Sequence, residues 1–376
     1  MIYMYVFFGS TFFAYLAYRS KDKALVIIFS AISILIPALL GGFRDEMIGI
    51  DSQVYGVRLS REALGSESFF DFFMKTKTEP GCKVLFYCGA KLLGNYTGAF
   101  ILLQLVTMTF FYIGAYKLRK FAPSPITFFV FFITFYTFTL TGMRQSLALS
   151  VTFMGLDTLL NGKYFKFTLY TATAMLFHYS AVANIPFLLG MHMLSTSETY
   201  QKNNSTKLII IGGMVISIMV LIPLMAMVAS RVSFLMKYAG YLVDVNNSGR
   251  ANVATDKSVA FDFLYVGEFI MLILFGRHAS HILRGSHGEN NASFCFLGTV
   301  FCLMFDIVVP FMHRAIMYWD VIHVMILAAL PGFVKEKYLR LMVLLVVTAL
   351  LLAYWWRGML VHGYNSRLYP FKFVSR

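Results

Sequence analysis

Long blocks of apolar residues, separated by short polar segments, run along almost the whole chain. A typical block holds about 17 to 22 residues, which as a helix is long enough to cross a hydrocarbon core about 30 Å thick. The blocks are apolar on every side, whereas strands of an outer-membrane barrel alternate apolar and polar residues. The pattern therefore predicts about twelve membrane-spanning helices, near residues 2–18, 24–41, 98–116, 125–141, 143–160, 165–178, 179–194, 208–229, 259–275, 292–309, 312–333 and 338–355.

Composition excludes a soluble globular protein. Hydrophobic residues occupy 59% of the 376 positions and charged residues only 13%, whereas about 25% of an ordinary soluble chain is charged. The four cysteines have neither the spacing of a zinc site nor the density of a disulfide scaffold, so we expect them to be packing residues. The sequence thus predicts an all-α polytopic membrane protein, and we expect no metal and no cofactor.

The net charge is +14, and the distribution of the basic residues along the chain indicates the membrane topology. Basic residues are divided among short alternate loops instead of forming one tract, which argues against a nucleic-acid partner. By the positive-inside rule these loops face the cytoplasm, and both termini face outward. Merging 165–178 with 179–194 into one tilted helix would break this alternation. The basic loops contain Arg19, Lys21 and Lys23; Lys117, Arg119 and Lys120; Lys163 and Lys166; Lys202 and Lys207; Arg277 and Arg284; and Lys335, Lys337 and Arg340.

A single integral membrane domain is expected over residues 1–376, with two longer extracytoplasmic loops. The loop at 42–97 contains seven of the 18 acidic residues, and its residues 84–93 are too short to span, which predicts a re-entrant or interfacial helix. The second loop is at 230–258. Long loops in a chain with few of them tend to carry function.

Several familiar active-site patterns are missing from the sequence. The chain has no phosphate-binding G-x-x-x-x-G-K-[ST] loop, no G-x-S-x-G nucleophile elbow and no Asp-x-Asp pair for a metal and a nucleotide sugar. These absences argue against ATP-driven pumping and against cytoplasmic transfer from sugar nucleotides.

Polar residues at the outer ends of the predicted helices are the candidates for chemistry. Arg144 and Gln145 stand at the start of a predicted span, where a guanidinium group and free backbone N–H groups can converge on a phosphate. The alternative is an arginine that snorkels to the interface. His178, also at an outer end, can exchange a proton or donate to phosphate oxygens, or else be a packing histidine.

The outer loop and the last third of the chain supply further candidates. Arg44, Asp51, Tyr55 and Glu79 offer charges and an aromatic ring that can hold a sugar, although an ordinary solvated loop has the same composition. Late in the chain Arg314 and Tyr318 lie four residues apart and so share a helix face. They are candidates for a ligand site or for a salt-bridged cluster at the interface.

The order of short motifs resembles the EpsG-like branch of the Wzy polysaccharide polymerases. The resemblance extends over about residues 43–373, thins between about 195 and 300, and ends in the closing L-Y-P-F-K-F run. Its motifs are Arg44, Gly49, Asp51 and Tyr55; Glu79, Pro80 and Gly81; Gly142, Arg144 and Gln145; Phe177, His178 and Ser180; and Arg314 with Tyr318.

The resemblance implies a GT-C-like glycosyltransferase in a bacterial inner membrane, with its active site facing the periplasm and no need for a nucleotide sugar or a metal. The implied reaction moves the growing glycan from undecaprenyl pyrophosphate onto the non-reducing end of an incoming lipid-linked repeat unit. A chain-length regulator and a flippase are further expected partners.

Roles for individual residues follow as hypotheses from the resemblance and from residue type. Arg144, with Arg314 as second candidate, would stabilise the charge on the leaving pyrophosphate. His178 or Asp51 would accept the proton of the attacking hydroxyl, and His178 could instead bind pyrophosphate. The expected substrate-binding residues are Arg44, Tyr55, Glu79, Gln145, Arg314 and Tyr318.

Two other functions remain open at this level. An O-antigen ligase uses the same donor with a different acceptor, and composition does not separate the two enzymes. A flippase or other transporter can also have twelve helices, but it should line a midplane cavity with charge and often shows repeated halves.

Overall fold

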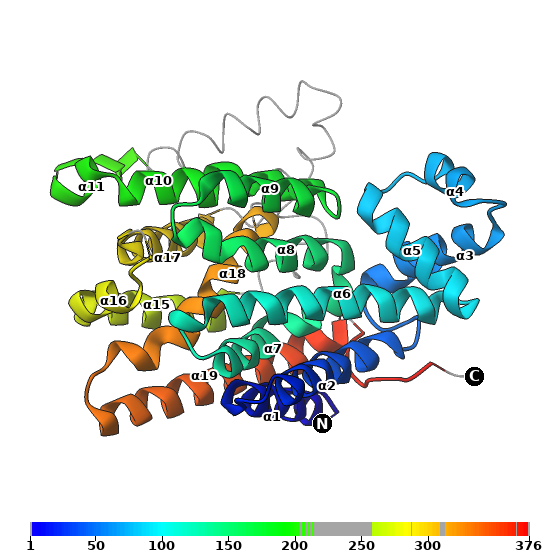
Figure 1. The fold of residues 1–376 in the computed structure, drawn as a ribbon, viewed down its shortest axis with the longest axis horizontal. Coiled ribbons are helices and arrows are strands. Elements are labelled where there is room, and N and C mark those ends of the chain that lie inside the picture. Colours follow the sequence, from blue (N-terminus) through cyan, green and yellow to red (C-terminus); the bar gives the residue numbers. More distant parts are fainter. Residues whose placement is uncertain are drawn as a thin grey trace. The chain divides into compact units, whose positions relative to one another are not determined.

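The computed structural model describes residues 2–203, some positions between 205 and 213, and residues 258–286, 288–308, 313–365 and 367–374. Within these ranges the chain forms helices and two isolated β-bridges, with no longer strand (Figure 1). The all-α class is thereby confirmed. In this part of the chain five helical stretches are long and apolar enough to cross a membrane, which makes the chain a membrane protein: Lys23–Gly42, Tyr96–Lys120, Ser124–Thr141, Ile316–Phe333 and Lys337–Met359.

The chain divides into two compact units. The first comprises Met1–Leu159, Lys163–Ile185 and Val321–Arg376. Its helices are α1 (Ile2–Arg19), α2 (Lys23–Gly42), the π-helix η1 (Ser52–Val57), α3 (Arg58–Gly65), α4 (Phe69–Lys75), α5 (Pro80–Leu93), α6 (Tyr96–Lys117), η2 (Leu118–Lys120), α7 (Ser124–Thr141), α8 (Met143–Leu160), α9 (Tyr164–Met175), η3 (Tyr179–Ala183), η7 (Leu330–Phe333) and α19 (Lys337–Asn365).

The second unit comprises Leu160–Gly162 and Pro186–Asp320. Its buried Asn291 donates from Nδ2 to the carbonyl oxygens of Leu160 at 3.0 Å and Leu283 at 2.7 Å, and its Oδ1 lies 2.7 Å from Nε2 of His192. Its described helices are α10 (Met191–Thr196), α11 (Glu198–Lys202), α15 (Ser258–Leu274), α16 (Gly276–Ile282) and α17 (Asn291–Val308), and it shares η4 (Asn184–Gly190) and α18 (His313–Ala329) with the first unit.

Most of the predicted spans are helices in the structure. The blocks from 2–18 to 165–178 form helices, as do the four blocks after residue 258. Residues 179–194 instead break into η3, η4 and α10, because Pro186 lacks the N–H that a regular helix needs. His178 has extended backbone angles (φ −158°, ψ 121°), so no single helix joins this segment to α9. The predicted span at 208–229 and the predicted loop at 230–258 lie almost entirely outside the described residues.

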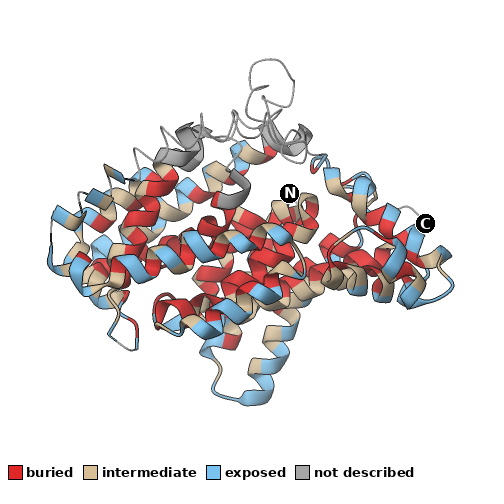
Figure 2. Cartoon of the chain, turned by 90° about the horizontal axis from the view of Figure 1, so that it is seen from above, coloured by how far each residue is buried: buried red, intermediate tan, exposed pale blue. Residues whose placement is uncertain are grey.

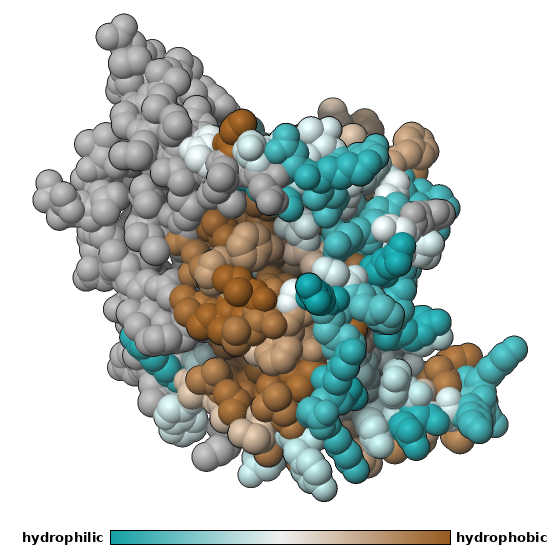
Figure 3. Space-filling model, turned by 90° about the vertical axis from the view of Figure 1, so that its left-hand side faces the viewer, coloured by the Kyte–Doolittle hydropathy of each residue, from teal (hydrophilic) through white to brown (hydrophobic). Residues whose placement is uncertain are grey.

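Apolar side chains remain on the surface of the long helices. In α19, Met342 and Leu345 are each 60% exposed. Exposed apolar side chains cost free energy in water but not in the hydrocarbon core of a membrane. Figure 3 shows hydrophobic side chains gathered on one face beside hydrophilic ones. Figure 2 shows buried residues concentrated where helices pack against one another.

The predicted outer loop at 42–97 is a compact group of helices. The expected short helix at 84–93 is α5, which begins earlier, at Pro80, and ends before Gly94 in the left-handed conformation (φ 69°). Its 14 residues are still too few to span. Apolar side chains from η1, α3, α4 and α5 share one core with α6 and the first residue of α8: Val57, Leu59, Ala63, Phe72, Cys82, Phe86, Ala90, Ala99, Phe100, Leu103 and Met143.

The C-terminal tail holds the beginning of this outer group in place. The backbone N–H of Asp45 donates to the carbonyl oxygen of Lys372, and that of Val374 to Phe43, both at 2.9 Å. These bonds form an isolated antiparallel bridge between Arg44 and Phe373. The closing L-Y-P-F-K-F run therefore pairs with the segment that carries Arg44.

Candidate functional site

Glu79 directly precedes the first residue of α5. Pro80 occupies that first position, where its missing N–H costs no hydrogen bond and its fixed φ favours the helix. The Glu79 side chain makes no capping bond to its own helix. Its carboxylate instead reaches side chains from two other segments.

The Glu79 carboxylate bridges Arg144 and His178. One oxygen, Oε2, lies 2.5 Å from Nη1 of Arg144, and the other, Oε1, lies 2.9 Å from Nδ1 of His178. The Thr78 hydroxyl donates to Oε2 at 2.9 Å and accepts from Nη1 of Arg144 at 3.2 Å. The Glu79 side chain is only 5% exposed, while those of Arg144 and His178 keep 17% and 18%. Both partners of the carboxylate therefore remain accessible.

The guanidinium of Arg144 also stacks on an aromatic ring. Its Cζ lies 4.1 Å from the ring centroid of Tyr55 in η1, a cation–π arrangement. Arg144 is the second residue of α8, where backbone N–H groups of the first turn have no helical acceptor. Its Nε is buried and has no hydrogen-bond partner among the described residues. This edge of the guanidinium is suited to an anion.

Close packing between α5 and the end of α9 brings Glu79 to His178. The N–H of Gly81 donates to the carbonyl oxygen of Leu176 at 2.8 Å, and the Cys82 thiol to that of Phe177 at 3.2 Å. A Cβ on Gly81 would come within 2.6 Å of Cε1 of Phe177. Only glycine therefore allows this approach, which brings the Glu-Pro-Gly segment against the Phe-His segment.

The hydrogen bond from His178 and the charge of Arg144 keep Glu79 ionised. Burial raises the pKa of Glu79, but the hydrogen bond from His178 and the positive charge of Arg144 together lower it more, to about 2. An ionised carboxylate only accepts hydrogen bonds, so the N–H group at Nδ1 of His178 donates a hydrogen bond to Glu79. In the neutral ring Nε2 is then the acceptor and can take up a proton.

Arg44 occupies a different place in the first unit, where it is completely buried. It donates from Nε to the Ser52 hydroxyl at 3.3 Å, and from Nη1 to the carbonyl oxygen of Gly41. Its Nη2 contacts the sulfur of Met143 at 2.8 Å, and its Cζ lies 4.1 Å from the Phe100 ring centroid. Burial lowers the pKa of Arg44 to about 10, so it stays protonated at neutral pH. These contacts hold α2, η1, α6 and α8 together.

The other expected site residues are placed as follows. Asp51 is half-buried immediately before η1, and Gln145 is buried beside Arg144 in α8. Arg314 and Tyr318 lie in the part of α18 that belongs to the second unit; Tyr318 is fully buried, and the Arg314 side chain lies outside the described residues.

The sequence reasoning missed Thr78, whose hydroxyl joins the Arg144–Glu79 pair. Its only signal in the sequence was its position next to Glu79. The Glu79 carboxylate already carries a guanidinium and a histidine, so this arrangement favours an anionic ligand over a metal cation.

A family model described as the EpsG family matches residues 26–373. The matched range includes Tyr55, Glu79, Arg144 and His178. No curated protein and no solved structure matches the chain.

Proposed function

Because the chain belongs to the EpsG family of Wzy-like polysaccharide polymerases, we propose that it joins lipid-linked oligosaccharide repeat units into a polymer. In this proposal the growing glycan leaves undecaprenyl pyrophosphate and is transferred to the non-reducing end of an incoming unit. The observation that supports it is the carboxylate of Glu79, which contacts both Arg144 and His178. Arg144 is the cation for the leaving pyrophosphate, and His178 is the base for the attacking hydroxyl.

Arg144 binds the pyrophosphate of the donor. Its Nη1 is held by Glu79 and Thr78, whereas its Nε has no hydrogen-bond partner among the described residues and is the donor we assign to an anionic oxygen. Cleavage of the anomeric bond increases the negative charge on the leaving oxygen, and a preoriented guanidinium stabilises that charge. The ring of Tyr55 keeps the guanidinium plane in this orientation.

His178 acts as the general base. The acceptor hydroxyl oxygen bonds to the anomeric carbon of the donor, and its proton passes to Nε2 of His178. The bond between that carbon and the pyrophosphate oxygen breaks, and undecaprenyl pyrophosphate leaves with the electron pair. Glu79 orients the imidazole and stabilises its protonated form, as a carboxylate does in catalytic triads.

The remaining candidates take supporting roles. Asp51 is the alternative base, and Gln145 extends the polar surface beside Arg144. We assign Arg44 to positioning η1 and α8, because its buried guanidinium is fully engaged by protein groups. Arg314 and Tyr318 stay candidates for contacts to the donor.

The proposal places the site at the periplasmic face of a bacterial inner membrane, in a GT-C-like arrangement of about twelve spans. It requires no nucleotide sugar and no metal. A flippase would deliver the lipid-linked units, and a chain-length regulator would be a second protein partner.

Incubation of the purified protein with a defined undecaprenyl-pyrophosphate oligosaccharide tests the function. A polymerase converts this single substrate into a glycan ladder that mass analysis resolves, and it releases undecaprenyl pyrophosphate. An O-antigen ligase would form product only with a lipid A core acceptor. A flippase would move the substrate across a vesicle membrane without changing its mass, and either result would overturn the proposal.

A further inference from the structure

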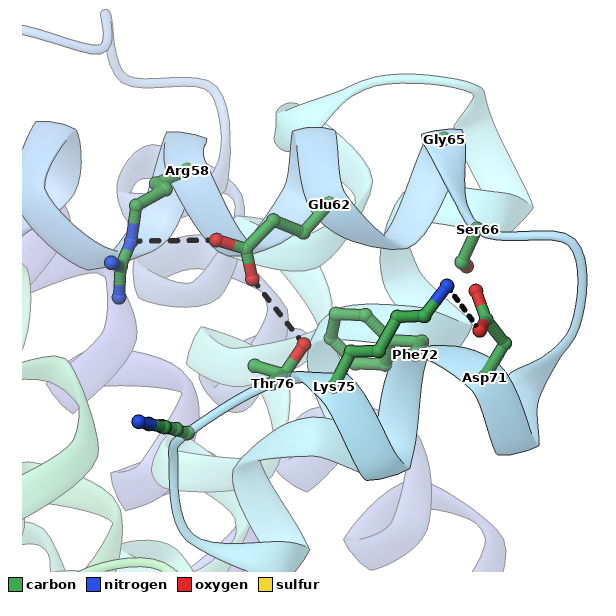
Figure 4. A pocket seen from close by; sticks show the side chains of 9 residues that line it. Arg58, Glu62, Gly65, Ser66, Asp71, Phe72, Lys75 and Thr76 are labelled. Carbon is green, nitrogen blue, oxygen red and sulfur yellow. Dashed lines mark hydrogen bonds and ion pairs between the residues drawn. The ribbon is translucent and has the colours of Figure 1, made fainter.

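A cavity of about 500 Å³ lies between α3 and α4 in the outer group of helices (Figure 4). This volume is within the range of about 300–1,000 Å³ that is typical of small-ligand sites. Its wall carries carboxylates on Glu62 and Asp71 and cations on Arg58, Lys75 and Lys77. The ring of Phe72, part of the core beneath the outer helices, also lines it.

The charged groups of this cavity form ion pairs within each helix, one in α3 and one in α4, and the Thr76 hydroxyl donates to Glu62 at 3.3 Å between the two sides. Lys75 lies 2.6 Å from Asp71, and Arg58 lies 3.7 Å from Glu62. Lys77 makes no ion pair with a described residue. Figure 4 shows the Glu62 carboxylate directed toward Thr76 and the Lys75 ammonium toward Asp71.

Two structural links join the cavity to the Glu79 site. Lys77, in its wall, is followed directly by Thr78 and Glu79. In addition, Cζ of Arg58 lies 6.0 Å from the Tyr55 ring centroid, and this same ring stacks on Arg144. The cavity is therefore connected to the residues that we assign to the reaction through the Lys77–Glu79 segment and through the Tyr55 ring.

The lining suits sugar rings in particular. Sugar hydroxyls both donate and accept hydrogen bonds, which matches a wall that alternates ammonium, guanidinium, carboxylate and hydroxyl groups. The apolar face of a sugar ring also packs on an aromatic ring. A docking site for a protein would instead be expected to expose aromatic or aliphatic anchors at its centre.

We propose that the α3–α4 cavity is a glycan subsite that binds sugars of the repeat unit distal to the reacting bond. This inference rests on the proposed function, because it takes the substrate to be a glycan. The subsite would select among repeat units by their sugars, while Arg144 and His178 act on a group common to all of them.

The test uses the full-length protein in lipid nanodiscs and the repeat-unit oligosaccharide freed of lipid and pyrophosphate by mild acid. Calorimetry measures its binding to the wild type, to Lys77→Gln and to the double variant Asp71→Asn/Lys77→Gln. Lys77 is exposed and Asp71 is half-buried, and both substitutions keep the size of the side chain, so folding should be retained, as the elution volume and Tm can verify. Arg61→Gln is the matched control, since Arg61 is an exposed α3 cation that does not line the cavity.

We expect the double variant to bind the free oligosaccharide at least tenfold more weakly, and the control to match the wild type. With the lipid-linked substrate, KM should rise by a similar factor while kcat is retained. Equal binding of the oligosaccharide by the wild type and the double variant would overturn the subsite. Equal binding is also the result expected if the cavity served a protein partner. Oligosaccharide binding that depends on Lys77 in a protein that forms no ladder would support the subsite and refute the polymerase.

Discussion

The carboxylate of Glu79 lies 2.9 Å from Nδ1 of His178, although the two residues are 99 positions apart in the chain. The second oxygen of the same carboxylate holds Arg144 at 2.5 Å. The group proposed to take the proton and the group proposed to bind the leaving pyrophosphate are therefore fixed to one anion. A change at Glu79 should disturb both, whereas a change at either partner should disturb one.

Glu79→Gln should reduce polymer formation by at least about 100-fold, because a neutral amide neither stabilises protonated His178 nor holds Arg144 by charge. Single-turnover rates with the lipid-linked substrate measure the effect. Glu46→Gln is the control, because among the described residues this half-buried acid of the same 42–97 segment forms an ion pair only with the exposed Arg61. Activity close to the wild type in Glu79→Gln would remove the bridge from the mechanism.

The stability that Glu79 contributes should depend on pH. Its pKa is about 2 in the folded protein, below the ordinary value near 4.5, so its contribution is complete above about pH 4.5 and is lost as the pH falls toward 2. The loss amounts to about 3 kcal/mol in total, from 1.36 kcal/mol per pKa unit. Tm should therefore differ between wild type and Glu79→Gln at pH 6 and converge on acidification. A difference that stays constant down to pH 3 would contradict this.

Arg144→Lys and Arg144→Ala should both cripple the enzyme. Lysine keeps one positive charge for Glu79 but lacks the planar group that stacks on Tyr55 and the Nε donor. We expect at least tenfold loss of ladder formation for lysine and a larger loss for alanine. The control is Lys202→Ala, at an exposed residue of α11. Unchanged ladders in both Arg144 variants, at normal expression, would refute the pyrophosphate site.

His178→Gln should lower kcat by about 10²- to 10⁴-fold, the usual contribution of general base catalysis. Glutamine preserves much of the size and can still donate to Glu79, but it does not take up a proton. Single-turnover rates of the wild type and the variant with the lipid-linked substrate measure the effect. A variant as active as the wild type across the whole pH range would exclude His178 as the base.

Gly81→Ala should lower activity through packing alone. The added Cβ would lie 2.6 Å from the Phe177 ring and 3.0 Å from the carbonyl oxygen of Leu176, so α5 must move away from His178. Overpacking of this kind costs about 1–3 kcal/mol. Gly358→Ala in α19, where nothing lies within 4 Å of the new Cβ, should be neutral. Partial rescue of Gly81→Ala by Phe177→Leu would identify the clash as the cause.

Several features of the protein were predictable from local sequence. Hydropathy predicted the helices, because the free energy of placing a segment in lipid depends mainly on its own side chains. The order of short motifs indicated the family. Arg144 and His178 were found as candidates because an ionisable residue at the end of an apolar block is unusual.

The sequence by itself thus determined an all-helical membrane protein, its family and most of the residues in its candidate site. Only the tertiary structure decided that Glu79 joins Arg144 and His178, where the sequence had suggested contact with a sugar, and that Arg44 is buried. The contacts of Glu79 join segments 65 and 99 residues apart, and the contact of Arg44 with Met143 also spans 99 residues. Such contacts arise from the close approach of backbone segments at Gly81 and from the core that η1, α3, α4 and α5 share with α6. No local pattern of hydrophobic and polar residues encodes either feature.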